Sequence, residues 1–180
     1  MIPMAQMRAM AWKNGGGTTR EIAVFPPGAG MDDFIWRLSM ATVEQAGPFS
    51  AFPGIERVLA VLDGRLSLVG QGLAAELDAA SAPLCFDAAL PVHGSPLGGP
   101  VRDLNAMVRR GACTVSMERL AHGSVVTGAP DRFLVALEEQ TCDGIGLGAG
   151  DCVVVTQDLR HDGPALLVTF TPPLSCPTPA

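Results

Sequence analysis

Four arginines are the side chains of this sequence that are best suited to binding chemistry. They are Arg20, Arg37, Arg57 and Arg102. A guanidinium group presents planar, forked N–H donors that can hold a carboxylate through two parallel hydrogen bonds. The chain has a net charge of −6 and so does not need these cations on its surface. We therefore expect them to bind an anionic ligand; the alternative is that each pairs with Glu21, Glu56 or Asp103.

The segment from Trp12 to Ile22, W-K-N-G-G-G-T-T-R-E-I, is the densest polar motif and contains the only lysine, Lys13. Its three consecutive glycines lose more backbone entropy than a plain turn requires, which predicts a positive φ angle or a close backbone approach. The N–H groups of such a turn can cradle a phosphate. A nucleotide-binding loop, however, ends in Gly-Lys-Ser/Thr and opens a helix, whereas here a strand-like segment follows. A hairpin or bulge turn without a ligand is the remaining alternative.

Residues 36–43 alternate in polarity, so their side chains point to opposite faces of a predicted strand. One face holds Trp36, Leu38 and Met40, and the other holds Arg37, Ser39 and Ala41. If the polar face lines the interior of a barrel, the barrel binds a polar ligand. If the apolar face does, Arg37 and Ser39 are ordinary solvent-facing residues. By the same rule, residues 18–24 place Thr18 with Arg20, away from Thr19 and Glu21.

Motifs for metal binding and nucleophilic catalysis are missing from the sequence. The three histidines are isolated, with no H-x-H pair and no carboxylate cluster to complete a metal site. No serine or cysteine stands in a nucleophile-elbow motif. We therefore expect neither a metal nor a cofactor. His93, close to Pro91 and Gly94, is still a candidate acid or base.

The elements that must position these residues are short strands. Fifteen prolines and 21 glycines interrupt the chain every eight to twelve residues or so, and the runs between them suit strands. The predicted strands are residues 18–25, 34–43, 57–62, 65–69, 84–86, 101–109, 113–120, 133–137, 152–156 and 165–170. Residues 72–80 could form a short helix, or a strand and a loop. The pattern predicts an all-β sandwich or barrel.

Two of these segments resemble each other. Residues 56–63, E-R-V-L-A-V-L-D, align without a gap on residues 131–138, D-R-F-L-V-A-L-E. Eight residues of similarity can arise by chance between two amphipathic strands. If the similarity is real, each half of the chain is a small barrel and the chain is a tandem duplication.

The composition excludes several classes of partner. With a net charge of −6 and no basic run, the chain lacks the clustered positive face that nucleic acids or anionic membranes require. No stretch approaches 18 consecutive apolar residues, and the N-terminus does not resemble a secretion signal. We expect a soluble, cytoplasmic protein. The five cysteines are widely spaced and read as reduced thiols: Cys85, Cys113, Cys142, Cys152 and Cys176.

Three motifs together resemble the HutD/Ves family. They are W-K-N-G-G-G-x-T-R-E-I, then F-x-W-R-L-S-x-A-x-V-x-x-x-G-P-F-S-x-F-P-G-I-x-R-x-L-x-x-L-x-G, then G-P-V-R-D-L-N-x-M-x-R-R. The match is dense over residues 12–64 and 99–110. The resemblance implies a cupin-type double jelly-roll barrel (bicupin) in one compact chain, with cupin-like barrels at residues 1–110 and 111–180. The chain lacks the H-x-H, glutamate and later histidine of metal-binding cupins, so it resembles a metal-free cupin.

The same resemblance implies an association with bacterial histidine utilisation. HutD is regarded there as a regulatory protein that binds a small anionic metabolite of the formylglutamate or urocanate class. The segments that carry the family motifs supply the expected ligand-binding residues: Trp12, Asn14, Thr18, Arg20, Arg37, Ser39, Ser50, Phe52, Arg57, Arg102 and Asn105.

Three hypotheses follow. The preferred one is a metabolite-binding regulatory protein whose partner is a small carboxylate metabolite. The second is a metal-free lyase, isomerase or hydrolase of such a metabolite, with Lys13, His93 or Asp103 as the proton carrier. The third is an interaction module without a ligand. The sequence leaves a homodimer open.

Overall fold

The computed structural model describes residues 1–173, and the chain is all-β there, as the sequence predicted. The single helix within that span is the three-residue 3₁₀ helix η1 (Met4–Gln6), far too short to cross a membrane. The strands are β1 (Arg8–Ala11), β2 (Gly17–Phe25), β3 (Trp36–Val43), β4 (Gly47–Pro48), β5 (Ile55–Asp63), β6 (Arg65–Gly70), β7 (Leu73–Asp78), β8 (Leu84–Asp87), β9 (Val92–Pro96), β10 (Val101–Arg109), β11 (Thr114–Leu120), β12 (Val125–Val126), β13 (Arg132–Ala136), β14 (Gln140–Cys142), β15 (Ile145–Leu147), β16 (Cys152–Val154), β17 (Leu159–Arg160) and β18 (Ala165–Thr171).

The first half of the chain, from β1 to β10 (residues 8–109), forms two antiparallel sheets that face each other. One sheet has the order β1-β2-β3-β10-β5-β8 and the other has the order β4-β9-β6-β7. Apolar side chains from both sheets meet between them, among them Leu59 and Val61 on β5 and Leu66 and Leu68 on β6. These strands are rich in the aliphatic residues that pack well on a pleated surface.

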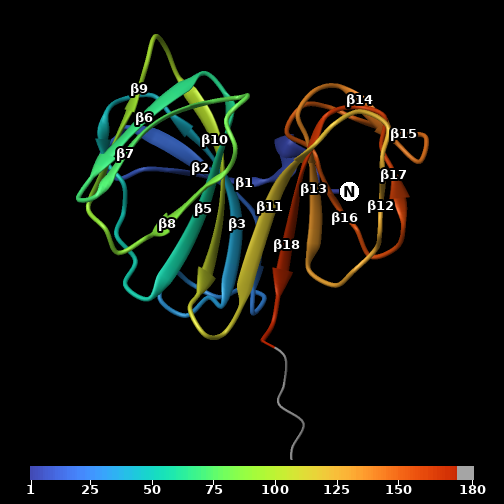
Figure 1. The fold of residues 1–180 in the computed structure, drawn as a ribbon, viewed down its shortest axis with the longest axis horizontal. Coiled ribbons are helices and arrows are strands. Elements are labelled where there is room, and N and C mark those ends of the chain that lie inside the picture. Colours follow the sequence, from blue (N-terminus) through green and yellow to red (C-terminus); the bar gives the residue numbers. More distant parts are fainter. Residues whose placement is uncertain (174–180) are drawn as a thin grey trace, which may run out of the picture.

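The second half, from β11 to β18 (residues 114–171), repeats the strand order of the first. Its main sheet is β11-β18-β13-β16, which matches β3-β10-β5-β8 when eight is added to each strand number. Its smaller sheets, β12-β17 and β14-β15, match β4-β9 and β6-β7, and a bridge between Cys142 and His161 joins them. The two similar segments, residues 56–63 and 131–138, therefore occupy equivalent places, in β5 and β13. Figure 1 shows the two halves side by side.

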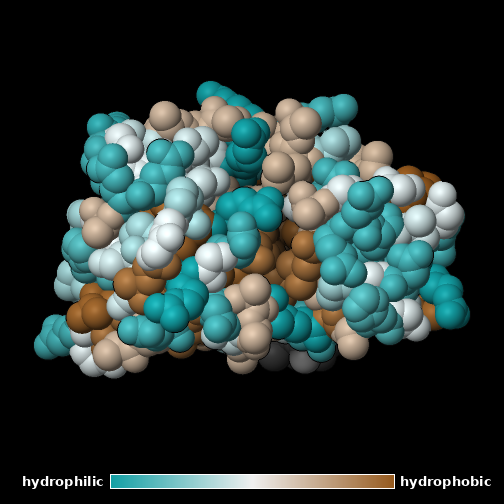
Figure 2. Space-filling view, turned by 90° about the horizontal axis from the view of Figure 1, so that it is seen from above, coloured by the Kyte–Doolittle hydropathy of each residue, from teal (hydrophilic) through white to brown (hydrophobic). Residues whose placement is uncertain are grey.

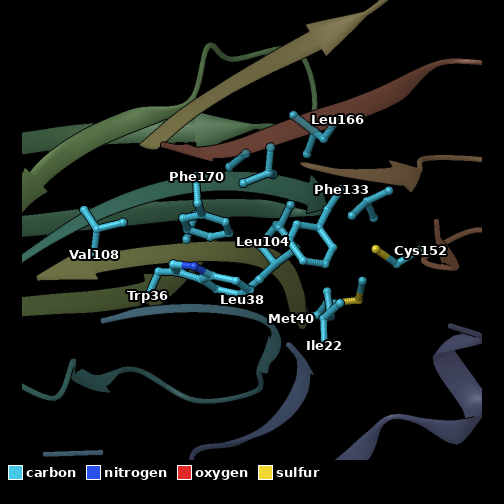
Figure 3. Close-up of a cluster of buried hydrophobic side chains, with 14 of the residues drawn as sticks. Ile22, Trp36, Leu38, Met40, Leu104, Val108, Phe133, Cys152, Leu166 and Phe170 are labelled. Atoms are coloured by element: carbon cyan, nitrogen blue, oxygen red, sulfur yellow. The ribbon is translucent and has the colours of Figure 1, made fainter. Parts of the chain in front are cut away.

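The main sheets of the two halves pack against each other through a large apolar cluster (Figure 3). The indole ring of Trp36 on β3 stacks on Phe170 of β18, with ring centroids 4.4 Å apart, and meets Phe133 of β13 edge to face at 5.6 Å. Leu38, Met40 and Leu104 lie in the same cluster. The apolar face of β3 thus packs between the two halves. Its polar face points to the other side, into the first half. The side chains on that face, Arg37, Ser39 and Ala41, are also buried.

Each of the ten predicted strands overlaps an observed one. Residues 72–80 form the strand β7 and its following turn, because Leu73, Ala75 and Leu77 alternate toward the core of the first half. The sequence analysis missed β1, β4, β9, β12, β14, β15 and β17. These strands are short or contain glycine and proline, and their pairing depends on partners far away in the chain.

The described cysteines are free thiols: Cys85 is exposed, whereas Cys113, Cys142 and Cys152 are buried. Cys176 lies outside the described residues. Burial raises the pKa of the Cys152 thiol to about 12, so this thiol is protonated and unreactive at neutral pH. The surface seen in Figure 2 is mostly hydrophilic, with hydrophobic side chains gathered in a hollow near its middle and in smaller areas elsewhere.

Candidate functional site

A cavity of about 710 Å³ lies in the first half of the chain. Its floor is the polar face of the six-stranded sheet, opposite the face that packs on the second half. The turn between β1 and β2 and the segment from Pro48 to Phe52 form its walls. Lys13 and Met31, both exposed, border it, so the cavity opens to solvent. Its volume is within the range of small-molecule sites.

The register of three neighbouring strands brings the polar side chains together. Strand β10 lies between β3 and β5, and Met107 on β10 stands opposite Arg37 on β3 and Arg57 on β5. Two residues earlier on β10, Asn105 stands opposite Ser39. Because side chains two residues apart share a face, Asp103, Asn105 and Met107 all line the cavity.

Arg57 is a buried cation that no carboxylate contacts within residues 1–173. Its side chain lies near three aromatic rings, with the guanidinium carbon 5.4 Å from the ring centre of Phe49, 5.8 Å from Phe52 and 5.7 Å from Phe86. Its Nη2 group donates a hydrogen bond to the carbonyl oxygen of Ser50 at 3.2 Å. Burial lowers the pKa of Arg57 to about 10, against the opposing effect of the Asp103 charge. The guanidinium therefore remains charged at neutral pH.

Arg37 differs from Arg57 because it already has an anionic partner. Its Nε group donates to Oε2 of Glu21 on β2 at 2.8 Å, and its Nη1 group donates to Oγ of Ser39 at 3.3 Å. The side chain of Arg37 is 6% exposed and that of Glu21 is 29% exposed. The Glu21 carboxylate thus balances the Arg37 charge, and Arg37 can still offer its remaining N–H donors.

Asp103 and Asn105 form the polar floor of the cavity. Asp103 is completely buried, and its Oδ1 atom accepts a hydrogen bond from Nδ2 of Asn105. Burial raises the pKa of Asp103 to about 7, although the Arg57 charge and the Asn105 hydrogen bond act in the opposite direction. A carboxyl group with this pKa can exchange a proton at neutral pH.

Three buried polar atoms have no hydrogen-bond partner within residues 1–173, and all three belong to this cavity. They are Arg57 Nε, Asp103 Oδ2 and Asn105 Oδ1. An unpaired buried polar group costs free energy, so such atoms call for a bound molecule or ordered water. Their grouping in one cavity makes this cavity the candidate functional site.

The glycine turn shapes the rim of the cavity. Gly15 has a φ angle of +69°, and a Cβ atom on Gly17 would lie 2.2 Å from the carbonyl oxygen of Thr42. The sequence predicted either a positive φ angle or a close backbone approach for this glycine run. Both occur: Gly15 has the positive φ angle, and Gly17 has the close backbone approach. The turn places Trp12, Lys13 and Asn14 on the cavity wall, and Nε1 of Trp12 donates to Oγ1 of Thr19 at 2.8 Å.

Eight of the eleven residues that the sequence analysis selected line this one cavity. They are Trp12, Asn14, Arg37, Ser39, Ser50, Phe52, Arg57 and Asn105. They come from four separate stretches of the sequence. The motifs selected these residues without showing that they are neighbours. The tertiary structure brings them together in one cavity.

Thr18, Arg20 and Arg102 do not line the cavity. On β2 the alternation places Thr19 on the cavity wall, so Thr18 and Arg20 point to the opposite side, where Nη1 of Arg20 lies 3.5 Å from the carbonyl oxygen of Met7. Arg102 pairs weakly with Asp63, at 4.0 Å, and precedes a register shift between residues 102 and 103. The ligand role expected for these three residues has no support in their positions.

The cavity also contains residues that the set of expected ligand-binding residues did not include. Thr19, Phe49, Asp103 and Met107 are the clearest examples. The alternation along residues 101–109 could have identified Asp103 and Met107, because Asn105 was already selected. His93, by contrast, is exposed on β9 outside the cavity, and its Nδ1 atom lies 3.4 Å from Oγ of Ser95. In the described part of the chain, no three His, Cys, Asp or Glu side chains are grouped as a metal site would require.

The relatives of this chain agree with the motifs that were read from its sequence. The HutD family model matches residues 4–166. The chain belongs to the HutD family. It is 34% identical to the protein Ves of Cronobacter sakazakii over 125 residues, which span 68% of this chain and 67% of Ves. It is 42% identical over 105 residues to an uncharacterised 21.2 kDa protein from the hutC 3′ region of Pseudomonas putida, spanning 53% of this chain and half of that protein.

Solved structures of this family have the same fold. HutD from Pseudomonas fluorescens SBW25, determined in a formate condition, superimposes with a TM-score of 0.82 at 28% identity, covering 95% of this chain and 97% of HutD. A bacterial pirin from Escherichia coli, YhhW, superimposes with a TM-score of 0.62 at 13% identity, covering 96% and 98% of the two chains. The second likeness concerns the fold alone, which is all-β and cupin-like. The HutD family is associated with hut genes.

Proposed function

We propose that this HutD-family protein binds a small carboxylate metabolite in the cavity of its first half and acts as a metal-free, regulatory metabolite-binding protein. The observation that carries the proposal is Arg57, a buried cation whose Nε atom has no partner within residues 1–173 and which faces the cavity. A buried charge without a contacting counter-ion is costly. A carboxylate ligand would supply that counter-ion through charge-assisted hydrogen bonds.

The other lining residues suit a small molecule that has both polar and apolar parts. Arg37 and Ser39 offer further donors, and Asn105 offers an unpaired amide oxygen that can accept an N–H from the ligand. Phe49 and Phe52 can pack against its carbon atoms. The association of the family with hut genes supports a metabolite of histidine degradation, of the formylglutamate or urocanate class.

The proposal includes a double jelly-roll fold with barrels at residues 1–110 and 111–180. The repeated strand order of the two halves supports it. In the second half, side chains such as Leu134, Leu147 and Leu167 pack into an apolar cluster. A pocket of about 720 Å³ is also present there, but no arginine lines it in the described structure. The second half then serves mainly to cover the apolar face of the sheet that carries the site.

Ligand-dependent melting tests the binding proposal. We expect formylglutamate or urocanate, but not every carboxylate, to raise the melting temperature, with a stabilisation of about 2.7 kcal/mol at a hundredfold excess over Kd. The variant Arg57→Gln should lose this shift. Arg102→Gln is the matched control, because it removes an arginine that lies outside the cavity. No shift of the native protein with histidine, urocanate, formylglutamate or glutamate at millimolar concentration would contradict the proposal.

A second candidate function is a metal-free enzyme acting on the same metabolites. Asp103 favours it, since a buried carboxyl group with a pKa of about 7 and an unpaired Oδ2 atom can serve as a general acid or base. Incubation of the protein with each metabolite, followed by chromatography, distinguishes the two functions. Turnover that Asp103→Asn abolishes, while binding persists, would favour the enzyme.

A further inference from the structure

We propose that the cavity takes up its anionic ligand together with one proton, which Asp103 accepts. This inference rests on the proposed function and concerns the regulation of the same site. It makes ligand binding dependent on pH near neutrality.

The first step of the argument is the geometry of Asp103. Its carboxyl group is completely buried, its Oδ1 atom accepts the Asn105 hydrogen bond, and its Oδ2 atom is left without a partner in the described chain. An ionised carboxylate tolerates such burial only with a nearby positive charge. Arg57 supplies that charge, and no ion-pair contact within 4.0 Å joins the two among the residues that the structure describes.

The second step is the separation of Asp103 and Arg57 along the sheet. Met107, which stands opposite Arg57, is four residues beyond Asp103 on β10, or about 13 Å of extended strand. Asn105 lies between them and also faces the cavity. An anion bound to Arg57 over Asn105 would therefore approach the Oδ2 atom of Asp103.

The third step is the charge of the whole cavity. Arg57 projects into it from β5, Arg37 from β3, and Lys13 from the turn before β2. Glu21, on β2, is not part of the lining but contacts Arg37. Glu21 already balances Arg37, and Lys13 is exposed to solvent at the rim. The segment from Pro48 to Phe52, which closes the cavity from the other side, contributes no charged side chain to the described lining. Arg57 is thus the main buried counter-charge of Asp103.

Binding of an anion removes this compensation. The ligand carboxylate neutralises Arg57 and places a second negative charge beside Asp103, which disfavours two ionised carboxylates in one buried site. Asp103 then accepts a proton from solvent on Oδ2, and the resulting O–H donates a hydrogen bond to the ligand. Burial raises the pKa of Asp103 to about 7, and the negative charge of a bound ligand raises it further, above neutral pH.

The sign of the pH dependence follows. Below about pH 7, Asp103 is already protonated and binding should hardly depend on pH. Above about pH 7, each bound ligand must bring one proton, so Kd should rise by up to about tenfold per pH unit until the pKa of the bound state is reached. The carboxylates of the ligand titrate near pH 4 and do not interfere.

Isothermal titration calorimetry with N-formyl-L-glutamate as the probe tests this inference. At pH 8 in phosphate and in Tris, which differ in ionisation enthalpy, we expect an uptake of about one proton per ligand bound. Asp103→Asn should bind with no proton uptake and a flat pH profile between pH 6.5 and 8.5. Asp63→Asn, which alters an acid outside the cavity, should behave like the native protein.

The outcomes separate this inference from the proposed function. Binding by the native protein without proton uptake, or with a flat pH profile, would overturn the inference and leave the proposed function standing. Failure of N-formyl-L-glutamate and urocanate alike to bind would overturn both. If Asp103→Asn does not fold, infrared difference spectra of the native protein serve instead: a protonated-carboxyl band that grows on ligand addition supports the inference, and its absence overturns it.

Discussion

At the residue scale, Asp103 and Arg57 define the character of the site. Burial raises the pKa of the Asp103 carboxyl group and lowers the pKa of the Arg57 guanidinium group. The charged form of each group is therefore less stable in the protein than it would be in water. Natural proteins keep such groups where function requires them more often than where stability does. Their unpaired atoms face the same cavity, which argues for one shared role.

The first prediction concerns stability and the ionisation of Asp103. The unfolded chain releases this proton near pH 3.8, whereas the folded chain holds it up to about pH 7. Between these values the native state binds more protons, so its free energy of unfolding falls as pH rises from about 4 to 7. The loss, relative to Asp103→Asn, should reach up to about 4 kcal/mol.

Urea unfolding of both proteins between pH 4.5 and 7.5 measures this difference. Asp63→Asn is the control: the Asp63 side chain is 70% exposed, so its removal should leave the pH dependence of the native protein unchanged. Parallel stability curves for the native protein and Asp103→Asn would show that Asp103 keeps an ordinary pKa.

At the element scale, the turn from Trp12 to Gly17 connects the sheet to the cavity wall. Gly17 starts β2 opposite Val43 on β3, and its missing side chain lets the carbonyl oxygen of Thr42 come close. Gly16 instead has only the flexible Asn14 side chain near its Cβ position, at 3.3 Å. The two neighbouring glycines should therefore respond differently to substitution.

The second prediction compares Gly17→Ala with Gly16→Ala. A Cβ atom 2.2 Å from a backbone oxygen forces β2 away from β3, so Gly17→Ala should lower the free energy of unfolding by about 1–3 kcal/mol. It should also weaken binding of the proposed ligand, because Trp12 and Thr19 move with the turn. Gly16→Ala should cost less, since the Asn14 side chain can move. Equal effects in chemical denaturation would contradict the assigned role of Gly17.

At the scale of the whole molecule, the two halves share one core. Trp36 from the first half packs against both Phe133 and Phe170 from the second, and those two rings also contact each other. Arg119 on β11 also donates to backbone oxygens of the first half, to Val61 at 2.7 Å and to Ser81 at 2.8 Å. The sheet that carries the cavity thus depends on the second half to cover its apolar face.

The third prediction follows from this shared core. Phe170→Ala should lower the free energy of unfolding by about 3–5 kcal/mol, as for other buried aromatic residues, while leaving a single unfolding transition. Val125→Ala is the control, because Val125 is 59% exposed and should have little effect. Two separate transitions, with one of them unchanged in Phe170→Ala, would show that the halves fold independently.

Much of the site was predictable because alternation along a strand is local. The faces of residues 36–43 and the ten main strands follow from neighbouring side chains, as do the arginines that suit a carboxylate. The sequence analysis selected Thr18 and Arg20, whereas Thr19 lines the cavity. Alternation pairs residues i and i+2 but does not say which pair faces inward.

The sequence by itself determined the all-β class, the HutD motifs and the set of polar residues from which the cavity is built. Only the tertiary structure decided that the polar face of β3 lines that cavity, because Phe133 and Phe170, more than 90 residues further along the chain, cover the apolar face. It also decided that Asp103 is buried within reach of the charge of Arg57. That proximity depends on the register of β10 with β5. Hydrogen bonds between strands that are distant in the sequence set this register, and no local sequence pattern encodes it.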